Sequence, residues 1–499
     1  MKWFLISLFL FPLFAVAQLR VAAVFSDNMV LQRDQPVHLW GKHIRGEKVT
    51  VKFAGIQKQT IVKNDSSWSV FFPSQKANAN PQSVSVSSSS EKIEFKNILI
   101  GDVWICSGQS NMEWTMRKEM HWNDEKVHTN NPLIRFLNPP PAGRYVYNEK
   151  YKDSLLRRLN KDSFYLWNGW KVCDSVTIQP MSAVAYYFAK TITASEQIPI
   201  GLINLSIGGA PIETFISTDA LKSNPAFSLK VNGNWLYNSS LPNWIRERAR
   251  QNVEAVADVP TDEYGPAHAY KPGFAFESGI KSLLSFPIKG MLWYQGESNA
   301  EELKRVAEYN SLVKLMVEDY RHLWKQPFMP FYFVQLSSIE RPLWPQFRDE
   351  QRKAVNEIPH SGMAVCSDIG AKNDVHPTNK KDVGERLARW ALLNDYHKKI
   401  IPSGPLPIKA VYKNGIIEIE FQYAVGMKTS DGKELRGFSV DGKNPAAAII
   451  SNNKVVISVQ QKPAFVYYGW QPFTDANLVN TEGLPASTFK LEISQDNTK

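Results

Sequence analysis

Residues 101–111 read Gly-Asp-Val-Trp-Ile-Cys-Ser-Gly-Gln-Ser-Asn, a short apolar run that stops at small and polar residues. A continuous apolar run of this length is typical of a strand that is buried on both faces. Ser110 and Asn111 are residue types that favour the first turn of a helix. The stretch therefore predicts a strand, a tight turn and a helix, the repeating unit of a sheet sandwiched between helices.

The same pattern recurs along the next 300 residues. Strand-like apolar segments are found at residues 98–105, 198–206, 288–294, 331–336 and 363–367. Amphipathic helical segments are found at residues 183–195, 302–324 and 380–396. This alternation predicts an α/β domain, residues 98–400, whose parallel sheet is covered on both faces. In such a sheet the reacting groups lie on loops at the carboxyl ends of the strands.

The two flanking regions have a different texture. Residues 18–97 and 405–499 contain short alternating runs separated by turn-forming residues, which predicts a small sandwich-like β module on each side of the α/β domain. Residues 114–180 and 217–275 are rich in Asn, Pro and aromatic residues and have poor periodicity. They are too long for ordinary loops, so we interpret them as insertions that wall a binding site.

The N-terminus predicts export. A basic start is followed by an apolar run of about 14 residues and by Ala15-Val16-Ala17, the small-x-small pattern of a signal peptidase site. A membrane anchor is the alternative, but a spanning helix needs roughly 20 apolar residues. We therefore assign residues 1–17 to a signal peptide cleaved before Gln18, and expect a secreted or periplasmic protein.

Composition narrows the function classes. The formal net charge is +10, and removal of residues 1–17 takes away one lysine and no acid, which leaves +9. The basic residues are scattered, and no nucleic-acid module is recognisable. No CxxC pair, HExxH motif or dense histidine cluster is found, so neither a metal nor another cofactor is predicted. With Cys106, Cys173 and Cys366, both a Cys106–Cys173 bridge and three free thiols remain open.

Ser110 and His376 are the candidate catalytic pair. Ser110 lies at a strand–helix junction, where its hydroxyl is exposed and helix amides favour a developing negative charge. A loop serine is more often a simple helix cap, so Ser110 needs a partner. His376 follows a predicted strand, precedes a predicted helix and has Asp374 two residues earlier. A neutral imidazole can take the serine proton while a carboxylate orients it.

Two further strand-end loops carry candidate oxyanion donors and substrate-binding groups. Gly208 and Gly209 let a backbone amide approach a ligand without obstruction by a side chain. Gln295, Glu297 and Asn299 crowd the end of the segment 288–294, and an amide there can donate to a tetrahedral intermediate. Trp114, Trp122, Trp344 and Trp470 are candidates for stacking against sugar rings.

The ordered set of motifs resembles the SGNH (GDSL-like) hydrolases, and most closely the sialate O-acetylesterase family of carbohydrate esterases. The resemblance rests on residues 103–114, the Gly208–Gly209 loop, residues 293–299 and residues 374–377, with further likeness at 25–32 and 468–472. It implies a flavodoxin-like catalytic domain and a covalent acetyl-serine mechanism. Ser110 would be the nucleophile and His376 the general base.

Two departures from the superfamily pattern leave the finer roles open. Gly296-Glu297-Ser298-Asn299 stands in place of the usual Gly-x-Asn-Asp block, which leaves the role of Asn299 as a donor open. Asn373 stands where the superfamily has its aspartate, three residues before His376, and Asp374 is one residue closer. The orienting group is therefore Asp374, another carboxylate such as Glu297, or a backbone carbonyl. For the substrate we expect an O-acetylated carbohydrate, foremost an O-acetylated sialic acid. The alternatives are xylan, pectin or another plant polysaccharide, or a non-catalytic carbohydrate-binding protein.

Overall fold

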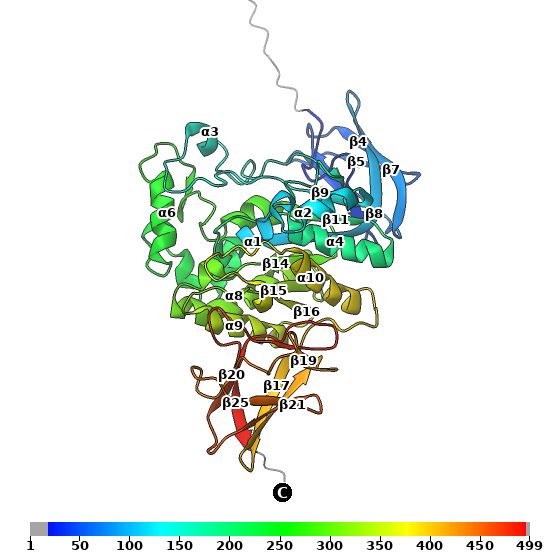
Figure 1. Cartoon of the computed structure of the whole chain (residues 1–499). Helices are drawn as coiled ribbons and strands as arrows, with labels where there is room; N and C mark the ends of the chain where they lie inside the picture. Colours follow the sequence, from blue (N-terminus) through cyan, green and yellow to red (C-terminus); the bar gives the residue numbers. More distant parts are fainter. Residues whose placement is uncertain (1–17, 496–499) are drawn as a thin grey trace, which may run out of the picture.

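The computed structural model describes residues 18–495, so the predicted signal peptide at residues 1–17 lies outside the described residues. Figure 1 shows three regions in chain order: N-terminal strands at the upper right, a central α/β region, and C-terminal strands at the bottom. Within residues 18–495, no helix combines the length and the apolar character that crossing a membrane requires.

The central sheet has the strand order β10-β9-β11-β8-β14-β15-β16. All neighbours along this path are parallel except β10, which runs antiparallel to β9. The strands are β8 (Lys92–Gly108), β9 (Asn131–Leu137), β10 (Lys171–Cys173), β11 (Ile200–Asn204), β14 (Gly290–Tyr294), β15 (Phe331–Gln335) and β16 (Ser361–Val365). The predicted parallel sheet is confirmed, and β9 and β10 extend it from within the segment that we interpreted as an insertion.

Every residue of β11, β14, β15 and β16 is buried, because helices cover both faces of the sheet. Helices α4 (Ala183–Glu196) and α10 (Lys381–Asn394) pack on each other, and so do α8 (Leu303–Trp324) and α9 (Trp344–Glu357). The other α-helices are short: α1 (Ser110–Glu113), α2 (Trp122–Glu125), α3 (Asp153–Leu156), α5 (Thr218–Ser223), α6 (Asn243–Val253) and α7 (Lys281–Leu283).

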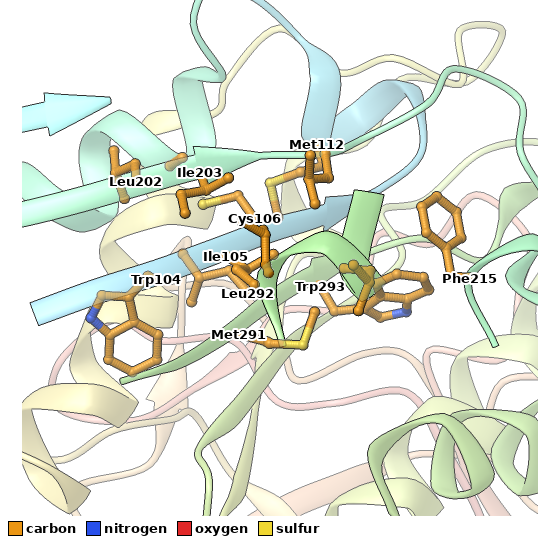
Figure 2. Packing of buried hydrophobic residues seen from close by; sticks show 14 of the residues in the cluster. Trp104, Ile105, Cys106, Met112, Leu202, Ile203, Phe215, Met291, Leu292 and Trp293 are labelled. Atoms are coloured by element: carbon orange, nitrogen blue, oxygen red, sulfur yellow. The ribbon is translucent and has the colours of Figure 1, made fainter. Parts of the chain in front are cut away.

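The interior of the α/β region is built from apolar residues of β8, β11 and β14 (Figure 2). Trp104 and Ile105 of β8 are 0% exposed, and the Phe215 and Trp293 rings meet edge to face at 5.2 Å. Burying each large apolar side chain contributes about 1.5–3 kcal/mol. Cys106, Cys173 and Cys366 are all free, buried thiols, which decides the question that the sequence left open.

The N-terminal strands are joined to the α/β region without a break. They are β1 (Arg20–Val21), β2 (Val30–Gln32), β3 (Val37–Lys42), β4 (Lys48–Phe53), β5 (Ile56–Ile61), β6 (Ser67–Phe72) and β7 (Asn78–Ser87). Strand β7 pairs with the first half of β8, whose second half lies in the central sheet, and the two regions share one hydrophobic core. Strand β8 thus runs across residues 97–98, where the sequence places a domain boundary. That boundary stays a prediction.

The C-terminal region has a hydrophobic core of its own. Its seven-stranded sheet has the order β20-β23-β25-β17-β18-β22-β21. The strands of this region are β17 (Leu406–Lys413), β18 (Ile416–Gln422), β19 (Lys428–Thr429), β20 (Phe438–Ser439), β21 (Ala448–Ser451), β22 (Lys454–Ser458), β23 (Phe465–Tyr468), β24 (Leu478–Val479) and β25 (Phe489–Gln495). The predicted β texture is present, and the sandwich-like packing of the two flanking modules stays a prediction.

Arg348 of α9 fastens the C-terminal region to the α/β region. Its guanidinium is fully buried and donates to the carbonyls of Gly469 at 2.9 Å, Gln471 at 2.6 Å and Pro472 at 3.3 Å. Burial without a carboxylate partner lowers the pKa of Arg348 to about 9. Three carbonyls of one loop thus depend on a single side chain from another region.

We expect Arg348→Met to destabilise the protein by roughly 3 kcal/mol, because it leaves buried carbonyls without a donor. Denaturant unfolding followed by tryptophan fluorescence measures this change. Arg436→Met is the matched control, since Arg436 pairs with Asp431 and Asp475 at the surface of the C-terminal region. Equal effects of the two substitutions would contradict the fastening role of Arg348.

Candidate active site

Three strand ends meet where the candidate nucleophile begins α1. A Cβ atom at Gly108 would lie 2.1 Å from the carbonyl oxygen of Tyr294, and the φ angle of Gly108 is +131°, so only glycine fits there. The Gln109 amide donates to the same oxygen at 2.9 Å, and the Gly108 carbonyl accepts the Ile207 amide at 2.9 Å. The ends of β8, β11 and β14 are thereby tied together next to Ser110.

This junction is also the topological switch point of the sheet. From β8 the chain first builds β9 and β11 on one side and then β14, β15 and β16 on the other. Ligand sites of open α/β sheets form at such a point, because loops diverge there to opposite sides. The predicted position of Ser110 at the carboxyl end of a strand thus coincides with the place where the fold opens a crevice.

Ser110 and His376 are in contact. The distance between His376 Nε2 and Ser110 Oγ is 2.8 Å, a hydrogen bond between a hydroxyl and an imidazole. Ser110 is the first residue of α1 and does not cap it; the cap position belongs to Gln109. Burial lowers the pKa of His376, and the nearby Lys380 cation lowers it further. At neutral pH the imidazole is therefore unprotonated and free to accept a proton.

Asp374 lies close to His376 but is not hydrogen-bonded to its ring. Asp374 Oδ1 accepts the backbone amide of His376 at 2.8 Å and lies 3.6 Å from His376 Nδ1. The Asp374 side chain is 62% exposed. Its charge raises the pKa of His376 and opposes the effect of burial. Among the alternatives that the sequence left open, Asp374 lies within ion-pair distance of the ring whenever His376 is protonated, and its orienting role stays a prediction.

Gly208 and Gly209 lie against the nucleophile. A Cβ atom at Gly208 would come within 2.9 Å of Glu113 Oε2 and 3.9 Å of Ser110 Cβ. Gly209 has a φ angle of +72°, and its carbonyl accepts the Ser298 hydroxyl at 2.9 Å. Both glycines belong to one turn, which at Gly208 passes beside Ser110, and their role as oxyanion donors stays a prediction.

Gln295 and Asn299 lie behind the catalytic pair and not on a cavity wall. Both are 0% exposed. Gln295 Nε2 donates to Asn299 Oδ1 at 2.8 Å and to Gln109 Oε1 at 3.1 Å. Asn299 Nδ2 donates to Glu213 Oε2 at 3.2 Å. These amides are engaged in holding the three loops together.

Asn111 and Lys380 are site residues that the sequence reading missed. Asn111 donates to the Glu297 carboxylate and, at 2.9 Å, to the carbonyl of Val375, the residue before His376. Its Oδ1 accepts Lys380 Nζ at 2.5 Å. Lys380 is fully buried, which lowers its pKa to about 7, and burial also raises the pKa of Glu297. The only sequence signals were the position of Asn111 beside Ser110 and of Lys380 at the start of a helix.

Two cavities open beside the pair, and Ser110 and His376 line both. The larger one has a volume of about 550 Å³ and includes Tyr147, Trp244 and Arg248 in its wall. The smaller one, of about 260 Å³, includes Trp114, whose ring stacks on His376 at 5.6 Å. Residues from both segments that we interpreted as insertions therefore reach the site. Of the other candidate stacking residues, Trp344 is only 1% exposed and cannot stack against a sugar.

No metal site accompanies the pair in residues 18–495, where no group of three or more His, Cys, Asp or Glu side chains could hold an ion. The chemistry available at the site is that of a serine hydroxyl, an imidazole and backbone amides. This set is suited to acyl transfer through a covalent acyl-serine.

Comparisons with known proteins agree with this chemistry. A family described as carbohydrate esterase, sialic acid-specific acetylesterase, matches residues 275–393. Sialate O-acetylesterase from Homo sapiens is 28% identical over 451 residues, covering 83% of this chain and 79% of that protein. The Mus musculus enzyme of the same name is 26% identical over 469 residues, covering 83% and 81%. The resemblance to the sialate O-acetylesterase family is confirmed.

A solved structure agrees with the sialate O-acetylesterase resemblance over nearly the whole chain. A carbohydrate acetylesterase from Xanthomonas citri superposes with a TM-score of 0.78 at 26% identity, covering 95% of this chain and 99% of that one. The chain therefore stands with the carboxylic ester hydrolases. The family match at residues 275–393 contains His376 and the loop 295–299, whereas Ser110 and the Gly208–Gly209 turn lie before it.

The position of Lys380 leads to a prediction about pH. Because the reaction needs unprotonated His376, kcat/KM should rise with pH through the lowered pKa of His376 and level off near neutral pH. Lys380→Met removes a cation that lowers this pKa, so the acid limb should move to higher pH. A pH profile of ester hydrolysis measures the shift.

Lys372→Met is the control for this experiment, because Lys372 is an exposed cation of the same loop. Its acid limb should coincide with that of the wild type. An unshifted limb in Lys380→Met, with the fold intact by circular dichroism, would contradict the electrostatic role of Lys380.

Proposed function

We propose that the protein is an exported serine esterase that removes acetyl groups from O-acetylated carbohydrates, foremost O-acetylated sialic acids. The observation that carries the proposal is the 2.8 Å contact between His376 Nε2 and Ser110 Oγ at the mouth of two cavities. The sialate O-acetylesterase relatives support the substrate class. The signal-like N-terminus supports secretion or a periplasmic location.

The proposed reaction has two halves. Ser110 Oγ attacks the acetyl carbonyl while His376 Nε2 takes the hydroxyl proton, and His376 then protonates the departing sugar oxygen. In the second half, His376 takes a proton from water, which attacks the acetyl-serine, and His376 then returns this proton to Ser110 Oγ as acetate leaves. The Ser110 amide and an amide of the Gly208–Gly209 turn are proposed to stabilise the oxyanion, with support from the loop 295–299.

Asp374 is the proposed orienting carboxylate. Its 3.6 Å distance from Nδ1 is longer than a hydrogen bond, but its Oδ1 already holds the His376 backbone amide. A charge on the imidazole would draw the exposed carboxylate toward the ring, because the pair then attracts. The Glu297 carboxylate accepts a hydrogen bond from Asn111. Because Glu297 is engaged there, Asp374 is the better candidate for the orienting role.

Ser110→Ala and His376→Ala should each lower kcat on a chromogenic acetate ester by on the order of 10⁴-fold or more. Each substitution removes a group on which covalent catalysis depends. The measurement is release of the chromophore at saturating substrate. His121→Ala is the matched control, since His121 pairs with Glu119 outside the cavity walls, and should retain wild-type turnover.

Full activity in either Ser110→Ala or His376→Ala would overturn the mechanism. Activity of the wild type on acetylated xylan but not on an O-acetylated sialic acid would overturn the substrate and leave the mechanism intact. If the wild type binds such glycans but hydrolyses no acetate ester, the chain is a carbohydrate-binding protein and not an esterase.

Asp374→Asn should lower kcat/KM on the order of tenfold, far less than loss of the base, because the carboxylate is exposed and not bonded to the ring. Since the Asp374 charge raises the pKa of His376, the acid limb should also move to lower pH. The pH profile of kcat/KM measures both effects. Glu297→Gln, which keeps an acceptor for Asn111, is the comparison; a larger loss there would transfer the orienting role to Glu297.

A further inference from the structure

Arg248 is a cation on the wall of the larger cavity, and in the described part of the chain it has no acidic partner. It belongs to α6, which lies at the left edge of the molecule in Figure 1, and it lines the 550 Å³ cavity together with Ser110 and His376. Within residues 18–495 its guanidinium forms no ion pair. It lies 4.7 Å from the ring centre of Tyr147 and 5.9 Å from that of Trp244, and it donates weakly to Tyr270 Oη at 3.5 Å.

Two arginines near Arg248 form ion pairs with carboxylates, in contrast to Arg248. Arg341, the other arginine of the cavity wall, pairs with Glu301 at 2.6 Å. Arg250, two residues along the same helix, pairs with Glu247 at 2.7 Å. The remaining carboxylate of the wall is Glu297, which is buried and accepts a hydrogen bond from Asn111, away from Arg248. Arg248 is therefore the arginine of this cavity wall whose charge is not matched by an ion pair in residues 18–495.

This charge lies close to the nucleophile. A Cβ atom at Gly209 would be 3.5 Å from Arg248 Nη1, and one at Gly208 would be 3.9 Å from Ser110 Cβ. Tyr270, which accepts from Arg248, also donates to the Gly208 carbonyl at 3.0 Å. One two-residue turn thus separates the guanidinium from Ser110, and both residues line the same cavity.

The surroundings of Arg248 suit a planar anion. Two aromatic rings lie beside the guanidinium, and the hydrogen bond that it forms among the described residues is the long one to Tyr270. A guanidinium binds a carboxylate through two parallel hydrogen bonds. We propose that Arg248 binds the carboxylate of an acidic sugar, so that the cavity selects O-acetylated sialic or uronic acids over neutral acetylated sugars such as those of xylan. This inference rests on the proposed esterase function and names its substrate class.

The test compares each acidic substrate with a form in which its charge is removed. The first arm uses 9-O-acetyl-N-acetylneuraminic acid and its carboxyl methyl ester; the second uses an O-acetylated galacturonate and its methyl ester. Release of acetate, not of methanol, is measured. In at least one arm the wild type should show a kcat/KM for the free acid at least about tenfold above that for the methyl ester. The arm with the larger ratio identifies the sugar.

Arg248→Met should abolish this preference by raising KM for the free acid, with little change in kcat. Arg248→Lys, which keeps the charge and loses the fork of N–H groups, should retain part of the preference. Arg250→Met is the matched control, because it removes the same charge from the same helix outside the cavity wall. It should behave as the wild type does.

Equal wild-type rates for free acid and methyl ester in both arms would overturn the inference, and so would an equal loss on acid and ester in Arg248→Met. Hydrolysis of p-nitrophenyl acetate without hydrolysis of any of the four sugars would also overturn it and leave the proposed esterase mechanism standing. If wild type fails to hydrolyse p-nitrophenyl acetate as well, the proposed function itself fails.

Discussion

At the end of β8 two backbones approach so closely that no side chain fits between them. A Cβ atom at Gly108 would lie 2.1 Å from the Tyr294 carbonyl, and the next amide, that of Gln109, donates to the same oxygen. Because the Gly108 carbonyl also accepts the Ile207 amide, the backbone fixes where β8, β11 and β14 end relative to one another. Ser110 follows after a single further residue, so its position is set by main-chain contacts over a fully buried apolar core.

Buried polar side chains, among them Asn111, Glu297 and Lys380, connect this strand end to the segment of His376 by hydrogen bonds. Burying an amide or a carboxylate is costly unless each group finds a partner, so such a layer has few alternative arrangements. Asn111 donates to Glu297 and to the carbonyl of Val375 and accepts from Lys380, which ties the residue after the nucleophile to the residue before the base. Beneath it, Gln295 links Gln109 to Asn299. Polar residues that look catalytic in the sequence thus include several that hold the catalytic pair in register.

The sequence allowed prediction of those parts whose signal is local. The strands at 198–206, 288–294, 331–336 and 363–367 were recognisable because both of their faces are buried, so their apolar runs are unbroken. Strands β9 and β10 were missed because each is short and is embedded in a segment of irregular composition, where only pairing within the sheet reveals the strand. Helix α9 was missed because its buried face includes the polar side chains of Arg348 and Gln351, which blurs its apolar period.

The same distinction applies to the site. Ser110 and His376 were recognisable because each lies at a strand–helix junction, which a sequence displays directly. Lys380 and Arg248 were not, because what sets them apart is their surroundings: Lys380 is buried and donates to Asn111, and no carboxylate of residues 18–495 forms an ion pair with Arg248. Neither burial nor the lack of an ion pair can be predicted from the local sequence, because both depend on residues from distant segments.

Lys380 and Arg248 both add positive charge to the site. Lys380 lowers the pKa of His376, which keeps the imidazole unprotonated but also opposes the imidazolium that must form during catalysis. Asp374, at 3.6 Å, offsets part of this cost as the imidazolium charge develops. The positive field meanwhile favours the oxyanion on the substrate and, at Arg248, an anionic sugar. Burial, and after it Lys380, lowers the pKa of His376, so the base stays neutral in a site where the proposed role of Arg248 favours substrates that carry negative charge.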